Sequence, residues 1–259
     1  SSSTGSFSTF AATTGLASAT TVSVVDPSTL SGAAVVDFED LGLAALDTIN
    51  LDEEFESGTV QFSAGFVGQT ITPSGSFDTL SGTPTGPLTL FNDDPDENIL
   101  AVDGGDGNVG NTSIAGLGPL GFPAFDAIGE GVISLLFDFD QSEFGFDLIG
   151  GDGGGATLQF FSRDGMLLSE IATGTIFGTI SLGFATDDGS QSIAGVSIVN
   201  SDPGGIGVDN ILSDVVGVIG PPPTVPPVTP PVAPIPLPAG AWLLLSGLAV
   251  LGASTKLRS

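Results

Sequence analysis

Hydrophobic and polar residues alternate in several short segments between residues 31 and 216. In the clearest of them, Phe137 and Phe139 alternate with Asp138 and Asp140. A period of two directs successive side chains to opposite faces of a β-strand, so one face is expected to be buried and the other to contact water. The predicted strands lie at residues 34–39, 59–63, 99–102, 132–139, 144–149, 157–161, 166–171, 175–185, 193–199 and 206–211.

Clusters of Gly, Asp, Asn and Pro separate these predicted strands. Such residues favour tight turns, because they adopt the required φ angles or hydrogen-bond to nearby backbone. Residues 41–49, with the sequence LGLAALDTI, are the one candidate for a short helix in this region. Many short strands with no helices between them predict an all-β fold, an antiparallel β-sandwich, over residues 31–216.

Residues 1–30 precede this body and are rich in Ser, Thr and Ala. They contain Ala17-Ser18-Ala19, a triplet with small residues at its ends that is typical of the end of a secretory signal peptide cleaved after Ala19. Two interpretations stay open at this point. The segment is either the remnant of a signal peptide or a flexible N-terminal arm.

Two further zones follow the body. Residues 217–236 are dense in proline, which favours an extended conformation, so they are predicted to form a semi-rigid linker. Residues 237–259 form an apolar tail that contains Trp242 and ends near Lys256 and Arg258. A helix over residues 239–257 would reach about 28 Å, close to the thickness of about 30 Å of a bilayer core. The tail is therefore predicted to be a single hydrophobic helix in a membrane, although a buried core helix of this length is also possible.

The tail also carries a motif. Ile235-Pro236-Leu237-Pro238-Ala239, a short apolar segment and a small basic cluster follow one another. This order resembles the C-terminal sorting signals of the PEP-CTERM type, and more narrowly the VPLPA variant, with Ile235 in place of Val. The basic end, with two cations, is weaker than the usual arginine cluster.

The resemblance implies a Gram-negative bacterium that exports the protein. The tail would be held in the inner membrane, with the body on the periplasmic side, until an exosortase processes it. Proteins of this type are associated with exopolysaccharide and with the cell surface or extracellular matrix.

The composition excludes many kinds of enzyme. The chain has no His, Cys or Tyr, which removes disulfides, thiolate nucleophiles, Ser-His-Asp triads and histidine-bound metals. Paired carboxylates for glycan hydrolysis remain conceivable, with Glu130, Asp138, Asp140 and Glu143 as candidates. Most Phe residues, however, occupy alternating strand positions that are typical of a core, so they are not expected to form a sugar platform. The chain is therefore predicted not to be an enzyme.

The net charge of the chain limits the kinds of molecule that it can bind. The chain has thirty Asp and Glu but only three basic residues, Arg163, Lys256 and Arg258, and all the acids lie between Asp26 and Asp214. Such a body repels nucleic acid, since it has no cationic patch to replace the counterions of phosphate. It would attract hard cations such as Ca²⁺. Solubility in a salty medium is the alternative explanation for most of these acids.

A looser resemblance suggests where calcium would bind. The body is similar to jelly-roll domains that begin near an FED-like segment, here Phe38-Glu39-Asp40, and end near a DN-hydrophobic segment, here Asp209-Asn210-Ile211. The resemblance implies a jelly-roll-like sandwich with a structural Ca²⁺ between Glu39 and Asp209. Acidic clusters at residues 93–97 and 103–108 are interpreted first as turns and second as cation loops.

Together these features predict an exported, non-catalytic protein of the cell surface or extracellular matrix. The first alternative is a calcium-dependent carbohydrate-binding module, and the second is a carboxylate-dependent glycan hydrolase. The run GGDGGG at residues 150–155 lacks the lysine of a phosphate-binding loop and is predicted to be a mobile loop.

Overall fold

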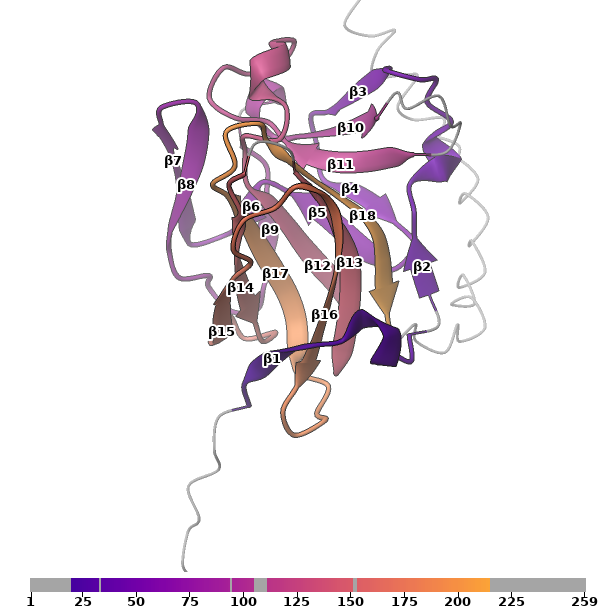
Figure 1. Cartoon of the computed structure of the whole chain (residues 1–259). Coiled ribbons are helices and arrows are strands. Elements are labelled where there is room, and N and C mark those ends of the chain that lie inside the picture. Colours follow the sequence, from indigo (N-terminus) through magenta and orange to yellow (C-terminus); the bar gives the residue numbers. More distant parts are fainter. Residues whose placement is uncertain (1–19, 33, 94, 105–110, 151–152, 215–259) are drawn as a thin grey trace, which may run out of the picture. The chain divides into compact units, whose positions relative to one another are not determined.

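The computed structural model describes residues 20–32, 34–93, 95–104, 111–150 and 153–214 (Figure 1). The chain divides into two units after Gly217, and every described residue belongs to the first unit. Two antiparallel sheets packed together make up this body, which confirms the predicted β-sandwich. The predicted C-terminal helix, the sorting motif and the proline-rich linker lie outside the described residues.

The first sheet has eight strands in the order β1-β16-β13-β18-β11-β10-β3, and β2 pairs with β18 outside this path. All of these pairs are antiparallel. The strands are β1 (Val22–Val25), β2 (Ala34–Val36), β3 (Thr48–Leu51), β10 (Ile99–Asp103), β11 (Thr112–Gly116), β13 (Glu143–Gly150), β16 (Gly178–Thr186) and β18 (Ile206–Ser213).

The second sheet has six strands in the order β15-β14-β17-β12-β5-β4. Its strands are β4 (Phe55–Ser57), β5 (Val60–Ser63), β12 (Ile133–Gln141), β14 (Ala156–Phe161), β15 (Leu167–Ala172) and β17 (Ile193–Asn200). Two smaller pairs are β6 (Gly65–Phe66) with β9 (Leu90–Phe91), and β7 (Gln69–Ser74) with β8 (Phe77–Gly82). Four short 3₁₀ turns complete the described elements: η1 (Pro27–Thr29), η2 (Glu39–Leu41), η3 (Pro95–Glu97) and η4 (Phe125–Ala127).

Phenylalanine rings from both sheets form the centre of the core. Phe144 on β13 lies 5.2 Å from Phe137 on β12 and 5.4 Å from Phe184 on β16, measured between ring centroids. Phe160 on β14 packs against Phe184 with the centroids 4.9 Å apart. All four rings are buried, as the pattern predicts for inward positions, whereas Phe139, two residues after Phe137 in the same alternation, is 43% exposed.

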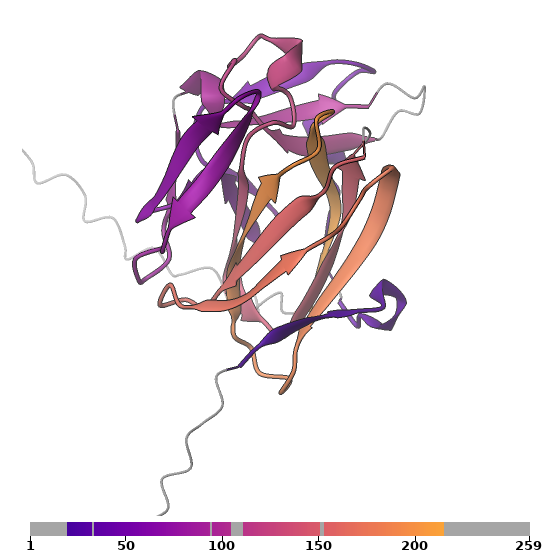
Figure 2. The same cartoon turned by 60° about the vertical axis from the view of Figure 1, so that its left-hand side comes forward.

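A second cluster covers the outer face of the six-stranded sheet. Phe66, Leu88 and Leu90 belong to the long connection between β5 and β10, and they pack on Leu136, Phe161 and Ala194 of the sheet. The β7–β8 hairpin belongs to the same connection and contacts β17. Figure 2 shows this hairpin beside the sandwich.

The structure corrects the prediction of a helix at residues 41–49. The 3₁₀ turn η2 ends at Leu41, and Gly42 and Leu46 adopt positive φ angles of 63° and 66°, which no α-helix tolerates. Ile49 then pairs with Ala101 as part of β3. Pairing with β10 therefore outweighs the local helix propensity of this segment.

The body also begins earlier than residue 31. Val22 to Val25 pair with β16 and add a strand to the edge of the first sheet, although they belong to the segment predicted as an arm. Conversely, the strand predicted at 34–39 stops at Val36, because Phe38 adopts a left-handed φ of 57° and η2 follows.

Among the described residues, the structure contains no helix with the length and hydropathy that a membrane span requires.

Candidate functional site

The candidate calcium residues, Glu39 and Asp209, lie beside an interval in the pairing of β18. Two strands, β11 and β2, pair with the same edge of β18, one on each side of this interval. On the edge of β18 opposite β13, β11 pairs with Gly207 and Val208, whereas β2 pairs with residues 211–213. Asp209 and Asn210 occupy the interval between these two pairings. The chain that leaves β2 forms η2 there, and Thr112 N at the start of β11 donates a hydrogen bond of 3.0 Å to Glu39 Oε1.

A β-bulge sets the direction of Asp209. Between the pairs Gly145–Leu212 and Asp147–Asp209, β18 has one residue more than β13, and Asn210 adopts a φ of 50°. Such a bulge resets the alternation of side chains, so both Val208 and Ile211 point into the core. Asp209 lies on the other face, beside Asp147.

Asp209 is surrounded by other acids. Its side chain is 5% exposed, and the hydrogen bonds described for it come from its neighbour Asn210, through the backbone N at 2.6 Å and Nδ2 at 3.2 Å. Burial raises the pKa of Asp209 to about 7, against the lowering effect of the Asn210 N–H. The negative charges of Glu39, Asp147 and Asp37 add to this increase.

In this arrangement Glu39 is close enough to Asp209 for its negative charge to raise the pKa of Asp209. No Lys or Arg balances it, because Arg163 is the only basic residue in the described ranges and it is paired with Asp140 at 2.7 Å. No group of three or more acids among the described residues is close enough to hold a metal ion. Calcium here would therefore depend on two carboxylates, together with backbone carbonyls and water.

The four acids considered for glycan hydrolysis each have a different structural partner. Asn200 Nδ2 donates to Glu130 Oε2 at 2.8 Å, and Gln61 Nε2 donates to Asp138 at 3.1 Å. Arg163 donates through two nitrogens to Asp140 Oδ1. Glu143 accepts hydrogen bonds from the backbone N and the hydroxyl of Ser31. Each of these acids is therefore hydrogen-bonded to a side chain or backbone group of another segment.

Two buried acids, Asp78 and Glu130, have raised pKa values, and only Glu130 is among the candidates named from the sequence. Asp78 on β8 is 2% exposed, and its Oδ1 has no hydrogen-bond partner among the described residues. Burial, followed by the charges of Asp93 and Glu97, raises its pKa to about 7. Burial also raises the pKa of Glu130, and Asp202 adds to this while Asn200 opposes it. Both acids lie in segments without strict alternation, so nothing in the local pattern indicates their burial.

Glu130 lines a pocket of about 610 Å³ at one end of the body. Three segments meet there: the turn of the β7–β8 hairpin, the connection between β11 and β12, and the loop before β18. The lining residues are Ser76, Leu120, Phe125, Asp126, Ile128, Glu130, Pro203 and Gly204. We call this the end pocket.

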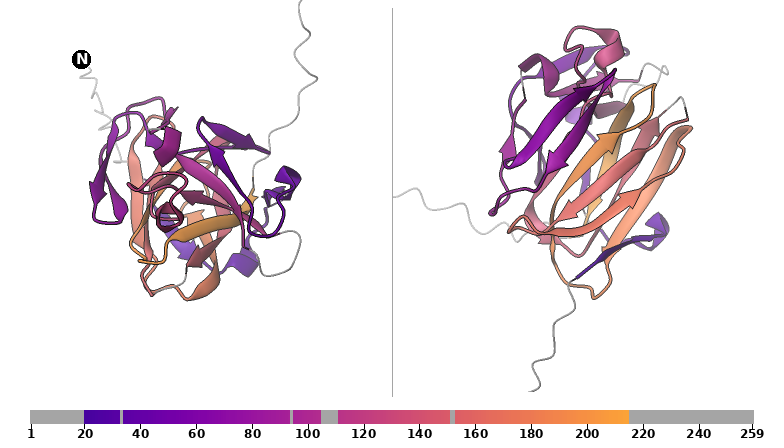
Figure 3. Two further views of the ribbon diagram at one scale, coloured as in Figure 1. Left: turned by 90° about the horizontal axis from the view of Figure 1, so that it is seen from above. Right: turned by 90° about the vertical axis from the view of Figure 1, so that its left-hand side faces the viewer.

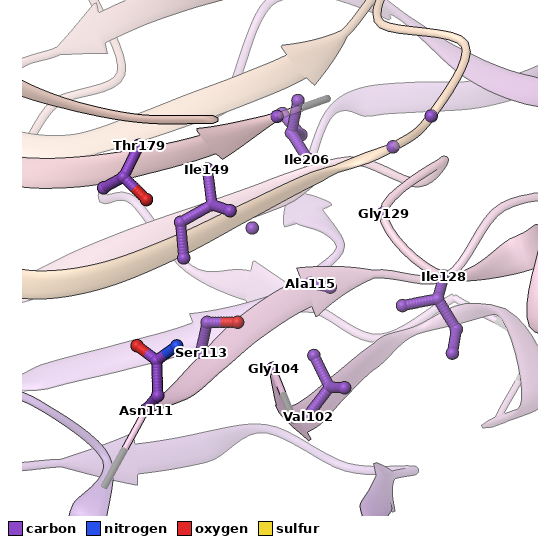
Figure 4. Close-up of a pocket in the computed structure, with 14 residues that line it drawn as sticks. Val102, Gly104, Asn111, Ser113, Ala115, Ile128, Gly129, Ile149, Thr179 and Ile206 are labelled. Atoms are coloured by element: carbon purple, nitrogen blue, oxygen red, sulfur yellow. The ribbon is translucent and has the colours of Figure 1, made fainter. Parts of the chain in front are cut away.

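A second pocket, of about 390 Å³, lies over the outer face of the first sheet. Figure 4 shows Ser113 and Val102 on one side of it and Ile149 and Thr179 on the other. All the described residues that line it are uncharged. These residues therefore offer shape and a few hydroxyl and amide groups, but no group for acid or base chemistry.

The acidic and glycine-rich loops are only partly described. Asp103 at the end of β10 pairs with Thr112 at the start of β11, and residues 105–110 between them lie outside the described residues. Near the other loop, Gly154 packs so tightly on the chain that a Cβ would lie 2.2 Å from Asp202 Cα. At this position glycine permits a close backbone contact. Gly154 is therefore packed against the chain, whereas the sequence predicts that it belongs to a mobile loop.

The remaining predicted residues, Ile235, Pro236, Leu237, Pro238, Ala239, Trp242, Lys256 and Arg258, lie outside the described residues. Neither a model of a known protein family nor a curated protein sequence matches this chain.

Proposed function

We propose that this protein is an exported, non-catalytic component of the cell surface or extracellular matrix, and that an exosortase sorts it through its C-terminal signal. The observation that carries this proposal is the order of motif, apolar segment and basic pair in the tail, from Ile235 to Arg258. The contacts of the candidate acids agree with it, because Glu130, Asp140 and Glu143 each accept a hydrogen bond from another segment of the body. We take the body to be jelly-roll-like and the protein to be associated with exopolysaccharide.

Mass spectrometry of the native protein tests the sorting step. If an exosortase cleaves the tail, the mature protein isolated from the cell surface should end upstream of Lys256 and Arg258, near the Ile235–Ala239 motif. The precursor in the inner membrane should retain both basic residues. A surface-exposed protein with its complete tail would contradict cleavage, and a protein confined to the cytosol would contradict the whole proposal.

A structural calcium ion is the second proposal, and it rests on the buried Asp209 beside Glu39. Their donor set suits calcium in kind, because both residues offer hard carboxylate oxygens and the one basic side chain of the described ranges, Arg163, is paired with Asp140. Bound calcium would neutralise the two charges and join the chain after β2 to β18. Such an ion also agrees with the alternative function, a calcium-dependent carbohydrate-binding module.

Replacing Asp209 with Asn should make the stability of the body less dependent on pH. Asp209 has a pKa of about 7 in the folded protein and a lower one when unfolded, so the folded state holds its proton more tightly. The free energy of unfolding should therefore fall as pH rises from about 4 to about 7, with this residue contributing on the order of 1–4 kcal/mol. Urea unfolding of both proteins at pH 5 and pH 8 measures the difference.

The effect of calcium on stability distinguishes a bound ion from simple solubility as the reason for the acidic residues at this site. At pH 8 and equal ionic strength, calcium chloride should raise the unfolding midpoint of the wild type more than sodium chloride does, and Asp209→Asn should remove most of that gain. Asp78→Asn is the matched control, because it removes another acid with a pKa of about 7 from a different element. Equal effects of calcium on all three proteins would exclude an ion at Asp209.

A further inference from the structure

The most exposed large hydrophobic side chain of the described body lies at the end pocket. Phe125, in η4, is 84% exposed, and Leu120 beside it is 59% exposed. Most other Phe rings lie in the core, where their burial stabilises the fold. Exposure of an aromatic ring at the rim of a pocket gains nothing for folding, so this ring is available to a ligand.

The pocket is built on a fixed framework. Asp78 N donates to Glu130 O at 2.9 Å and thereby joins the hairpin to the connection before β12. Asn200 Nδ2 donates both to Glu130 Oε2 at 2.8 Å and to Asp202 O at 3.0 Å. Gly204 N in turn donates to Asp202 Oδ1 at 2.9 Å. The floor and one wall are therefore held in place before any ligand arrives, which lowers the entropic cost of binding.

The polar groups of the pocket select the charge of the ligand. Glu130, which is 4% exposed, lines the pocket, and Asp126 lies at its exposed rim. Both are hydrogen-bond acceptors when ionised, and the described residues that line the pocket include no cation. An anionic ligand would be repelled, whereas a ligand with hydroxyl or ammonium groups would supply the missing donors.

We propose that the end pocket binds a sugar chain, with one face of a pyranose ring on Phe125 and its donor groups on Glu130 and Asp126. A sugar ring combines a face of C–H groups with a rim of hydroxyls, which matches an aromatic ring beside carboxylates. The pocket volume of about 610 Å³ falls within the range of about 300–1,000 Å³ that is usual for small-ligand sites. This inference rests on the proposed association with exopolysaccharide and assigns a site to it.

Calorimetric titration of the full chain in mild detergent tests the site with three hexasaccharides: cellohexaose, the glucosamine hexamer and an alginate hexamer. We expect the first two to bind and the anionic hexamer not to bind. Phe125→Ala should weaken binding about tenfold, which corresponds to the contribution of a stacked ring. Asp126→Asn should weaken binding of the glucosamine hexamer more than that of cellohexaose, because only the former carries ammonium groups.

Phe139→Ala is the matched control, because Phe139 is also exposed but lies near the far end of β12 from Glu130. The affinity of the Phe139→Ala variant for the hexamers should equal that of the wild type. The proposal is overturned if neither uncharged nor amino-sugar hexamers bind, if alginate binds equally well, or if Phe125→Ala binds like the wild type. None of these results affects the sorting proposal, which the mature C-terminus and the cellular location decide independently.

Discussion

Removal of residues 237–259 should release the protein from the inner membrane into the periplasm or the medium. The deleted segment contains the apolar stretch and both C-terminal cations, Lys256 and Arg258, which would otherwise hold the precursor with its body on the periplasmic side. Because the whole of the proposed anchor is deleted, the expected change is nearly complete. Fractionation of cells, followed by immunoblotting against the body, measures it.

A second variant separates anchoring from recognition. Replacing Leu237 and Pro238 with Ala leaves the apolar stretch intact but alters the sorting motif, so this protein should accumulate in the inner membrane as an unprocessed precursor. Retention of the truncated chain in the membrane fraction would refute the tail as the anchor. Normal processing of the double substitution would refute the motif.

Phe144→Ala should destabilise the body by about 3–5 kcal/mol, as is usual for loss of a fully buried aromatic ring. Phe144 contacts Phe137 and Phe160 of the opposite sheet and Phe146 and Phe184 of its own. Its removal leaves a cavity between the sheets that the surrounding strands cannot close. Urea unfolding followed by far-ultraviolet circular dichroism gives the change in free energy.

Phe139→Ala again provides the comparison, since Phe139 is half-exposed near the end of β12. Its cost should stay below about 1 kcal/mol, because little apolar surface is lost from the core. Similar losses in the two variants would mean that the ring cluster at Phe144 is not the centre of the core.

The alternation of apolar residues predicted the strands that face the core on one side. β12, β13, β14, β17 and β18 lie within a residue or two of their predicted positions. The strand predicted at residues 59–63 corresponds to β5, but the other short strands between residues 48 and 91 were not predicted, because each has few residues and pairs at an edge or in a hairpin. β1 was missed for a different reason, since its partner β16 lies more than 150 residues away and a Ser/Thr-rich segment gives no local indication of pairing.

In the candidate site, too, some features could be predicted from the sequence and others could not. A resemblance suggested Glu39 and Asp209, and the structure explains their proximity by the pairing of β2 with β18. The bulge at Asn210 could not be predicted from the pattern, because it depends on how β18 aligns with β13. The end pocket was also missed. Its lining comes from three segments that are distant in sequence, and the alternating pattern predicts that most Phe residues lie in the core.

The position of β18 has a mechanical consequence. The strand begins directly after Pro203 and Gly204 of the end pocket and ends at Ser213, beside the last described residue, Asp214. In Figures 1 and 3, the coil that contains η4 lies at the end of the body where β18 starts, and β1 lies at the other end. A sugar chain held in the pocket and a tether attached beyond Asp214 would pull β18 along its own axis. Its hydrogen bonds to β13, β11 and β2 run across that axis, so they would bear the load in shear, together rather than one after another.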